Sequence, residues 1–460
     1  MKKLALFVLS IFLFISATAE TPGYSSRMIN SQGAGYAFSN WDYVPGLVIK
    51  TMLMYCKQYP EDELSTRAYN WCKSYADRAI DDKGNFYNFK EGSLDNIASG
   101  KVLLDLYAME STRNPTDSER YRKAAEYLYI YLRYHYPRIQ RSEGENCFIH
   151  KTSYPDQMWL DGLYMGSAFY AEYVSMFLPD DNEAWEDITL QFTTIHEHTY
   201  DTEKGLNYHA WSANPEDDNS FWARRSEPNK GCSQEFWGRG MGWYAAALVD
   251  VLEVMPREHP GYAKLSEIFK QVADGICRWQ DATSGVWYQL LQYDNSFRSA
   301  GGNPNYLEAS ASNMFTYALL KGMKLGVLDI KEYCSAATRA YEGLISTFIT
   351  TNNQGGIDIN DICRSAGLGP SSDRERDGTA NYYLDGRDVT RVANEGKGIG
   401  SFIMASLEYE KYLTTSIESV RADESSQTMY YDLHGRRYQS EPKGLYIELK
   451  DGVASKMINK

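Results

Sequence analysis

Between residues 44 and 413, helical segments that are apolar on every side alternate with segments that are apolar on one side only. The one-sided kind is clearest at 265–276, where six apolar residues recur at spacings of three and four. The all-apolar kind has no face for water and must be buried on every side. Segments of that kind begin near Asp95, Asp161, Arg239, Glu308 and Glu395.

This alternation predicts an all-α fold in which inner and outer helices form a closed ring of helical hairpins, an (α/α)6 barrel. A linear solenoid of helical pairs is the alternative, although solenoid repeats are usually shorter and more alike in sequence. Loops rich in glycine and aromatic residues precede the buried segments, at 82–87, 205–211, 285–288 and 355–358. We expect these loops to gather on one face of the barrel, and we expect the functional site there.

The two ends of the chain differ from this pattern. Residues 1–19 read as a signal peptide, with Lys2 and Lys3 before an apolar run and a small-residue cleavage site at 17–19. No later stretch has the length of a membrane-spanning helix. We therefore expect an exported protein that is periplasmic, surface-bound or secreted.

After the barrel, predicted for residues 20–413, residues 414–428 are rich in Ser, Glu, Asp and Thr and are expected to be a linker. Residues 429–460 contain two strand-like runs separated by turn residues. This tail resembles the C-terminal sorting segments of type IX secretion. A small β-rich appendage with no targeting role is the alternative.

Charge and cysteine content exclude several classes of function. The chain has 47 basic and 61 acidic residues, a formal charge of −14, which argues against nucleic acid or an anionic membrane as a partner. Its seven cysteines are scattered and show no metal-type spacing, so we expect no disulfide framework and no zinc site. Ten Trp and 37 Tyr are compatible with carbohydrate binding.

Asp161 is the first candidate for chemistry. It lies inside the apolar run 158–165, two residues after Trp159, where loss of hydration should disfavour its charged form. A carboxyl that stays partly protonated near neutral pH is suited to general acid catalysis. The alternative is a helix N-cap that faces water. Trp159 is either a core residue or a platform for a sugar face.

Asp95 begins the preceding buried segment and is the natural partner for a carboxyl pair, although it too could be an N-cap. His209 lies in an aromatic loop, where it either contacts a ligand or is simply solvated. Arg239 lies between Trp237 and Trp243 in a glycine-rich helix start and needs an anion. That anion is either a substrate carboxylate or an internal aspartate such as Asp95 or Asp161. The start of the helix at 308–312 is most simply structural.

Several motifs occur in an order that resembles the unsaturated rhamnogalacturonyl hydrolases of glycoside hydrolase family 105. They are Asn40-Trp-Asp-Tyr43, Leu94-Asp95, Tyr154-Pro-Asp-Gln-Met-Trp-Leu-Asp161, Trp237-Gly-Arg-Gly-Met-Gly-Trp243, Glu308-Ala-Ser-Ala-Ser312, Arg376-Asp-Gly-Thr379 and Gly396-Lys-Gly-Ile-Gly400. The resemblance covers about residues 35 to 414. It implies an (α/α)6 barrel that releases 4,5-unsaturated galacturonic acid from the non-reducing end of pectin (rhamnogalacturonan) fragments.

By this resemblance, Asp161 is the general acid and base and Asp95 is the second essential carboxylate. The substrate contacts that it implies are Tyr43, Lys151, Trp159, His209, Trp237, Arg239 and Trp243. The implied reaction is hydration of the C4=C5 double bond, in which Asp161 protonates C4 and Asp95 helps to keep Asp161 protonated through like-charge coupling. This reaction requires no metal or organic cofactor.

Two departures from the family pattern bear on specificity. The Met-Gly that follows Arg239-Gly is unusual, and the loop at 214–232 is long and polar, so the leaving sugar need not be rhamnose. The alternatives are an unsaturated glucuronyl hydrolase acting on ulvan or glycosaminoglycan fragments, and a catalytically silent glycan-binding barrel. Oligomeric state is not predicted.

Overall fold

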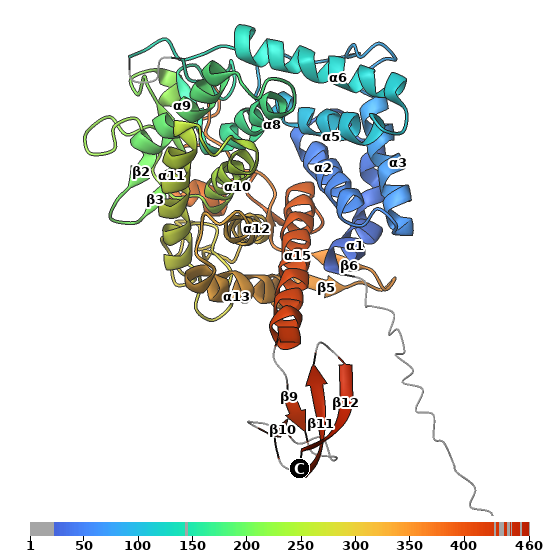
Figure 1. The fold of residues 1–460 in the computed structure, drawn as a ribbon. Coiled ribbons are helices and arrows are strands. Elements are labelled where there is room, and N and C mark those ends of the chain that lie inside the picture. The colour runs from blue at the N-terminus through green and yellow to red at the C-terminus, as the bar shows by residue number, and fades with distance from the viewer. Residues whose placement is uncertain are drawn as a thin grey trace, which may run out of the picture.

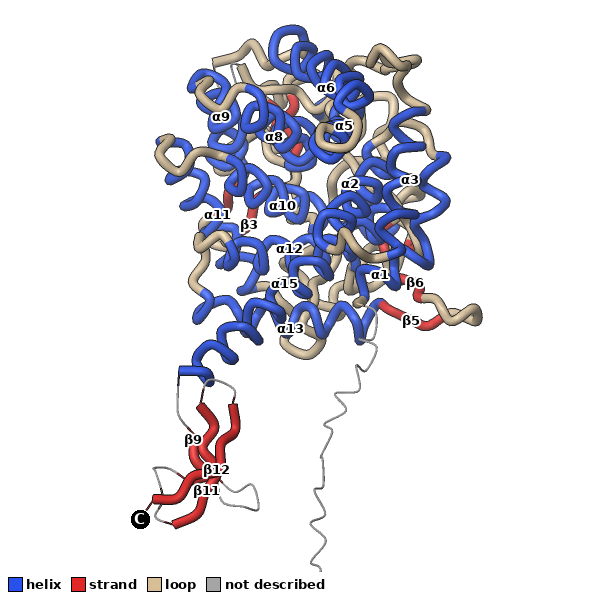
Figure 2. Tube along the Cα trace, turned by 45° about the vertical axis from the view of Figure 1, so that its right-hand side comes forward, coloured by secondary structure: helices blue, strands red, loops and turns tan. Residues whose placement is uncertain are grey.

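A computed structural model describes residues 23–142, 146–426, 429–431, 437–438, 442, 444–450 and 453–459. The signal peptide expected at 1–19 lies outside the described residues, so it stays a prediction. Over the described ranges the chain is mainly helical, and its strands are short pieces among the loops or in the C-terminal tail (Figure 2).

Six long helices within the described residues form a closed inner ring (Figure 1). They are α2 (Tyr43–Gln58), α5 (Gly100–Glu110), α8 (Ala168–Phe177), α10 (Gly238–Val254), α12 (Ala309–Lys324) and α15 (Gly396–Ser426). Each packs against the next, and α15 packs against α2. The ring confirms the predicted barrel and excludes the solenoid, whose ends would not meet.

Outer helices cover this ring, and each packs against the inner helix that precedes it in the chain. They are α3 (Glu63–Asp77), α6 (Pro115–Ile130), α9 (Asn182–Thr199), α11 (Pro260–Arg278) and α13 (Ile330–Phe348). The short α1 (Tyr24–Met28) packs against α15, where the Ser25 hydroxyl donates a hydrogen bond to Glu410 at 2.8 Å. The apolar stripe of α11 is buried, as its spacing predicts.

The buried segments begin where the sequence predicts. The short helices α4 (Asp95–Ala98) and α7 (Leu160–Gly162) start the second and third inner segments, and α7 continues into the π-helical η4 (Leu163–Ser167). Loops and short antiparallel pairs connect outer helices to the next inner helix. These pairs join β1 (Gln157–Trp159) to β4 (Ala210–Ser212), β2 (Tyr200–Asp201) to β3 (Leu206–Asn207), β5 (Ile349–Thr351) to β6 (Ile357–Ile359), and β7 (Ile362–Cys363) to β8 (Arg391–Val392).

The tail contains strands where they are predicted. Its described parts form an antiparallel sheet in the order β10-β9-β11-β12, from β9 (Met429–Tyr431), β10 (Arg437–Tyr438), β11 (Gly444–Lys450) and β12 (Val453–Asn459). The segment expected to be a linker, 414–428, is helical through Ser426 because α15 continues into it. In the part of the chain that the structure describes, no helix combines the length and apolarity needed to cross a bilayer.

Two backbone segments approach so closely at Gly275 that no side chain fits between them. Gly275 of α11 packs against the β2–β3 turn, and a Cβ atom at this position would lie 1.8 Å from the carbonyl oxygen of Gly205. We expect Gly275→Ala to lower the free energy of unfolding by about 3 kcal/mol, because backbone must move to relieve the clash. Gly35→Ala is the control, since no atom lies within 4 Å of its added Cβ. Urea unfolding of both variants measures the difference, and equal stabilities would contradict the expectation.

Candidate active site

The candidate residues lie where the inner segments begin. Tyr43 starts α2, Asp95 starts α4, Asp161 is in α7, and Arg239 is in the first turn of α10. Lys397, which the sequence analysis did not single out, is in the first turn of α15. Helix N-termini carry partial positive charge, so this end of the barrel favours an anionic ligand even though the protein as a whole is acidic.

Asp95 is held by two side chains from the loop before β1. Its carboxylate lies 2.6 Å from the ammonium of Lys151 and 3.8 Å from Nε2 of His150. Backbone contacts fix this loop beside α4, because the amide of Leu94 donates to the carbonyl of His150 at 3.2 Å. Asp95 and Lys151, both predicted from sequence, therefore form an ion pair at the start of the helix.

Asp161 forms the partly exposed end of a chain of polar groups whose other members are buried. Its carboxylate lies 3.0 Å from Nε2 of His209, and Nδ1 of His209 lies 2.6 Å from the hydroxyl of Tyr383, a residue of α14 (Ala380–Asp385). Burial raises the pKa of the Tyr383 hydroxyl well above its ordinary value, so this hydroxyl keeps its proton and donates it to Nδ1. His209 must then carry its own proton on Nε2 and donate it to Asp161.

This chain corrects the expectation that Asp161 is partly protonated at rest. Burial does raise the pKa of Asp161, but His209 and the more distant Arg239 favour the carboxylate, and the pKa is lowered overall. The sequence identifies the apolar surroundings correctly. The histidine that offsets them comes from the following hairpin. Asp161 and Asp95 both act electrostatically on His150, so the two carboxylates flank one site, as predicted.

Trp159 has one face in an aromatic stack. Its ring lies 4.4 Å from that of His150 and 4.9 Å from that of Tyr154, with nearly parallel planes. Its indole nitrogen donates to Gln157 at 3.1 Å. Trp159 is buried, and its interpretation as a core residue therefore holds for much of its surface. Trp159 is the ring common to both contacts, since the His150 and Tyr154 rings lie 6.4 Å apart.

Burial of His150 makes stability depend on pH. Burial lowers its pKa from 6.5 to about 4. Below pH 6.5 the unfolded chain binds a proton that the folded protein refuses, so the free energy of unfolding falls as the pH falls toward 4. We expect His150 to account for a loss of about 2 kcal/mol between pH 7 and pH 5. Urea titrations should show a smaller loss over this interval for His150→Gln than for the wild type; an equal loss would contradict the assignment.

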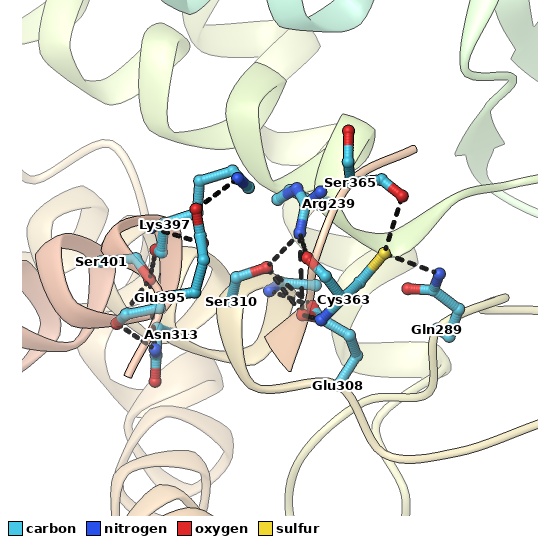
Figure 3. Close-up of polar contacts among 12 residues, drawn as sticks. Arg239, Gln289, Glu308, Ser310, Asn313, Cys363, Ser365, Glu395, Lys397 and Ser401 are labelled. Atoms are coloured by element: carbon cyan, nitrogen blue, oxygen red, sulfur yellow. Dashed lines mark hydrogen bonds and ion pairs between the residues drawn. The ribbon is translucent and has the colours of Figure 1, made fainter. Parts of the chain in front are cut away.

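Arg239 is almost completely buried and is partly used by the fold (Figure 3). Its Nη1 donates to the hydroxyl of Ser310 at 3.3 Å and to the carbonyl of Cys363, and it lies 3.9 Å from the carboxylate of Glu308. The internal anion is therefore Glu308, and neither Asp95 nor Asp161 supplies it. Glu308 also caps α12, which confirms the structural interpretation of that helix start.

The other edge of the same guanidinium lacks hydrogen-bond partners among the described residues. Nε is buried without a hydrogen-bond partner, and Nη2 makes no hydrogen bond with any described residue. Nε and Nη2 together form an edge that can grip a carboxylate with two parallel hydrogen bonds. Tyr43 lies near Arg239, and the ammonium of Lys397 lies 5.9 Å from the Tyr43 ring. The Lys397 ammonium also pairs with the carboxylate of Glu395 at 2.5 Å, so the cation of this group that lacks a full set of partners among the described residues is Arg239.

Trp237 packs against Arg239, and Trp243 packs against Tyr43. The Trp237 ring lies 4.8 Å from the guanidinium carbon of Arg239, and the Trp243 ring lies 6.4 Å from that of Tyr43. Each tryptophan is only 1% exposed. Their observed contacts are with the residues that line the site, and the direct substrate contact expected of them stays a prediction.

Sequence reasoning missed His150, Tyr383 and Lys397. His150 and Lys397 carried signals, because His150 precedes Lys151 in the loop before β1 and Lys397 lies within Gly396-Lys-Gly-Ile-Gly400, one of the motifs of the family resemblance. Tyr383 carried none, since it is one of 37 tyrosines and its partner is 174 residues away. Among the described residues, no cluster of three or more His, Cys, Asp or Glu side chains is arranged to hold a metal ion.

Comparison with known proteins agrees with this geometry. The family model described as Glycosyl Hydrolase Family 88 matches residues 25–413. A solved family 105 glycoside hydrolase from Clostridium acetobutylicum (C. acetobutylicum ATCC 824) is 35% identical, with a TM-score of 0.73 over 85% of this chain and 100% of that one.

Two curated relatives extend the comparison. Protein Atu3128 of Agrobacterium fabrum is 36% identical over 53% of this chain and 97% of its own length. The unsaturated rhamnogalacturonyl hydrolase YesR of Bacillus subtilis is 24% identical over 59% of this chain and 69% of its own. The chain is similar to a solved family 105 hydrolase and to an unsaturated rhamnogalacturonyl hydrolase. By its family model, it belongs to Glycosyl Hydrolase Family 88.

Proposed function

We propose that this protein releases 4,5-unsaturated galacturonic acid from the non-reducing end of rhamnogalacturonan oligosaccharides. The observation that carries the proposal is the Nε–Nη2 edge of buried Arg239, which lacks partners among the described residues, in the same site as the carboxyl of Asp161. An unsaturated uronide needs both groups, one for its carboxylate and one for its double bond. The similarity to YesR supports rhamnogalacturonan as the source of the substrate.

The first step follows from charge. The substrate carboxylate binds to Arg239 and neutralises one of the groups that lowers the pKa of Asp161, while the sugar displaces water. Both changes raise the pKa of Asp161, so this residue takes up a proton in the complex. Protonated Asp161 then transfers that proton to C4 of the enol ether, and an oxocarbenium ion forms at C5.

The second step consumes one water molecule. Water adds to C5, and its proton passes to the carboxylate of Asp161, which now acts as a base. The resulting hemiketal opens by breaking the bond between C5 and the ring oxygen. A hemiacetal remains at C1 and collapses to an aldehyde, which expels the linked sugar as an alcohol. Asp95, fixed by Lys151 at 2.6 Å, supplies the second negative charge beside the cationic intermediate.

Tyr383 acts in this scheme as a positioning residue, because it fixes the tautomer of His209. We expect Tyr383→Phe to lower kcat by about tenfold, because His209 can then place its proton on Nδ1 and no longer donates to the Asp161 carboxylate, the form that must accept the proton of water in the second step. That change favours protonated Asp161, so the basic limb of the pH profile of kcat/KM should move to higher pH. KM should change little, because Tyr383 lies behind His209.

Tyr382→Phe is the matched control, because its hydroxyl accepts from the amide of Gly367 at 3.0 Å and makes no hydrogen bond to His209. Steady-state rates between pH 4 and pH 9 for both variants test the assignment. A normal kcat and an unmoved pH profile in Tyr383→Phe would show that Tyr383 has a packing role only.

Incubation with fragments made by polysaccharide lyases tests the function itself. Unsaturated fragments of rhamnogalacturonan, ulvan and chondroitin are supplied separately, and the absorbance of the conjugated double bond is followed. We expect that absorbance to disappear with the rhamnogalacturonan fragments. Loss with ulvan or chondroitin fragments alone would instead show an unsaturated glucuronyl hydrolase, and no loss with any of them would leave a silent glycan-binding barrel.

One structural feature favours keeping the glucuronyl alternative. The long loop at 214–232 packs on Trp159 through Trp222 and Ala223, so it shapes the wall beside the reacting sugar. A relative from Alteromonas, an unsaturated 3S-rhamnoglycuronyl hydrolase, is 25% identical over 37% of this chain. The loop residues that face the linked sugar would decide between the two substrates.

Export completes the proposal. The basic, apolar and small-residue parts of 1–19 support export of the protein across the inner membrane. Outside that membrane it would meet polysaccharide fragments. Fractionation of cells that express the full chain tests this: we expect the protein in the periplasm, at the cell surface or in the medium. Removal of the 429–460 tail should trap it in the periplasm if that tail is a sorting segment.

A further inference from the structure

An aromatic hollow opens beside the candidate active site. It has a volume of about 470 Å³, and Trp41, Phe86, Tyr87, Asn88, Lys90 and Asn96 line most of it. This volume lies within the range of ligand sites, roughly 300–1,000 Å³. The hollow lies between the loop before α2, the end of α3 and the loop before α4.

A thin wall separates the hollow from the active site. Two pairs of consecutive residues build it, and each pair contributes one side chain to each side. Trp41 lines the hollow, whereas Asp42 is close enough to Asp95 for that charge to raise its pKa, although burial is the larger cause. Asn96 lines the hollow, whereas Asp95 pairs with Lys151. The Trp41 indole donates to the carbonyl of Asn96 at 2.9 Å and ties the two pairs together.

The chemistry of the lining suits a sugar. Tyr87 is 60% exposed, which leaves its ring free for a ligand, and beneath it Trp41 and Phe86 pack against each other at 5.1 Å as an aromatic floor. Aromatic rings stack well on the apolar faces of flat rings, and the exposed amide of Asn88 can both donate and accept hydrogen bonds with hydroxyl groups.

The charge of the lining selects an acidic sugar. Arg78 and Lys90 both line the hollow, and neither forms an ion pair with a described side chain. None of the described lining residues is acidic, in a protein whose formal charge is −14. Two uncompensated cations in such a protein attract a carboxylate.

We propose that the aromatic hollow binds the leaving-side sugars of the same oligosaccharide, with a uronate carboxylate at Arg78 and Lys90. This inference rests on the proposed function for the identity of the oligosaccharide. The reacting sugar occupies the site between Asp161 and Arg239, and the chain then crosses the Trp41–Asn96 wall into the hollow. We expect a disaccharide to end before the hollow, so contacts in the hollow should affect the turnover of longer fragments only.

The test compares an unsaturated disaccharide with an unsaturated hexasaccharide from the same lyase digest. The double variant Tyr87→Ala/Lys90→Ala should lower kcat/KM for the hexasaccharide by about tenfold and leave the disaccharide within about twofold. The control variant Phe38→Ala/Lys83→Ala removes an exposed ring and a cation outside the hollow and should change neither. No effect on the hexasaccharide, or an equal loss on both substrates, would overturn the proposal.

A binding experiment separates failure of this inference from failure of the proposed function. If the wild type turns over neither substrate, the proposed function fails, and the hollow is then tested with saturated oligogalacturonate as the probe. Calorimetric titration of the full chain should show binding that the Tyr87→Ala/Lys90→Ala variant weakens by about tenfold and the control variant retains. Absence of binding to the wild type, or equal binding by all three proteins, overturns the inference.

Discussion

Asp161→Asn should lower kcat by at least about a hundredfold, the usual contribution of a positioned acid and base. The amide has the size of the carboxyl, and its oxygen can accept the hydrogen bond that His209 now gives to Asp161 across 3.0 Å. It cannot transfer a proton to C4 or accept one from water. Loss of substrate absorbance under saturating conditions measures the effect.

Asp156→Asn controls for the loss of a carboxylate close to Asp161 in the chain, because Asp156 precedes β1 and pairs with Arg141 at 3.0 Å. It should keep wild-type activity. A folded Asp161→Asn variant, judged by its thermal transition, that retains more than a tenth of the wild-type rate would remove Asp161 from the role of acid and base.

Arg239→Lys should lower kcat/KM on unsaturated uronides by about tenfold or more, because it keeps the charge and loses the planar Nε–Nη2 edge. The lysine variant is a sharper test than alanine. Arg239→Ala would also leave the fully buried Glu308 without its cation, and breaking a buried pair costs roughly 3–5 kcal/mol of stability. Loss of activity in the alanine variant would then mix binding with folding.

Arg391→Lys is the matched control, because Arg391 pairs with Asp361 on the surface. Full kcat/KM curves for the two lysine variants distinguish a substrate contact from a structural cation. Normal turnover by Arg239→Lys, with a lowered unfolding midpoint, would mean that Arg239 serves only Glu308 and the carbonyl of Cys363.

The sequence predicts those features that depend on local pattern. A helix with no polar face must be buried wherever it lies in the chain. The pattern of apolar residues was therefore enough to locate the starts of the inner segments near Asp95, Asp161, Arg239 and Glu308. Because each of Asp95, Asp161 and Arg239 begins an inner segment, they could be placed at one end of the barrel. The apolar surroundings of Asp161 were also predicted, because its neighbours in the chain are apolar, although 13% of its side chain is exposed.

Features that depend on distant partners could not be predicted in this way. The pKa of Asp161 is lowered because His209 reaches it from 48 residues away. The carboxylate beside Arg239 is Glu308, from the next inner helix, although the sequence pointed to aspartates that begin earlier ones. Tyr383 has no local signal at all. In each case an inter-helix contact decides the electrostatics, and amino-acid periodicity carries no information about such contacts.

The contact between α1 and α15 has a consequence for the synthesis of the chain. The Ser25–Glu410 hydrogen bond joins residues 385 apart, and α15 fills the gap between α12 and α2. The barrel therefore cannot close until nearly the whole chain has left the ribosome. Until then α2 and α12 each present an apolar flank, and nascent chains with such flanks are prone to aggregate. Folding of the barrel thus requires the last inner helix, α15. Nonsense mutations before residue 396 should therefore yield insoluble fragments rather than smaller active enzymes.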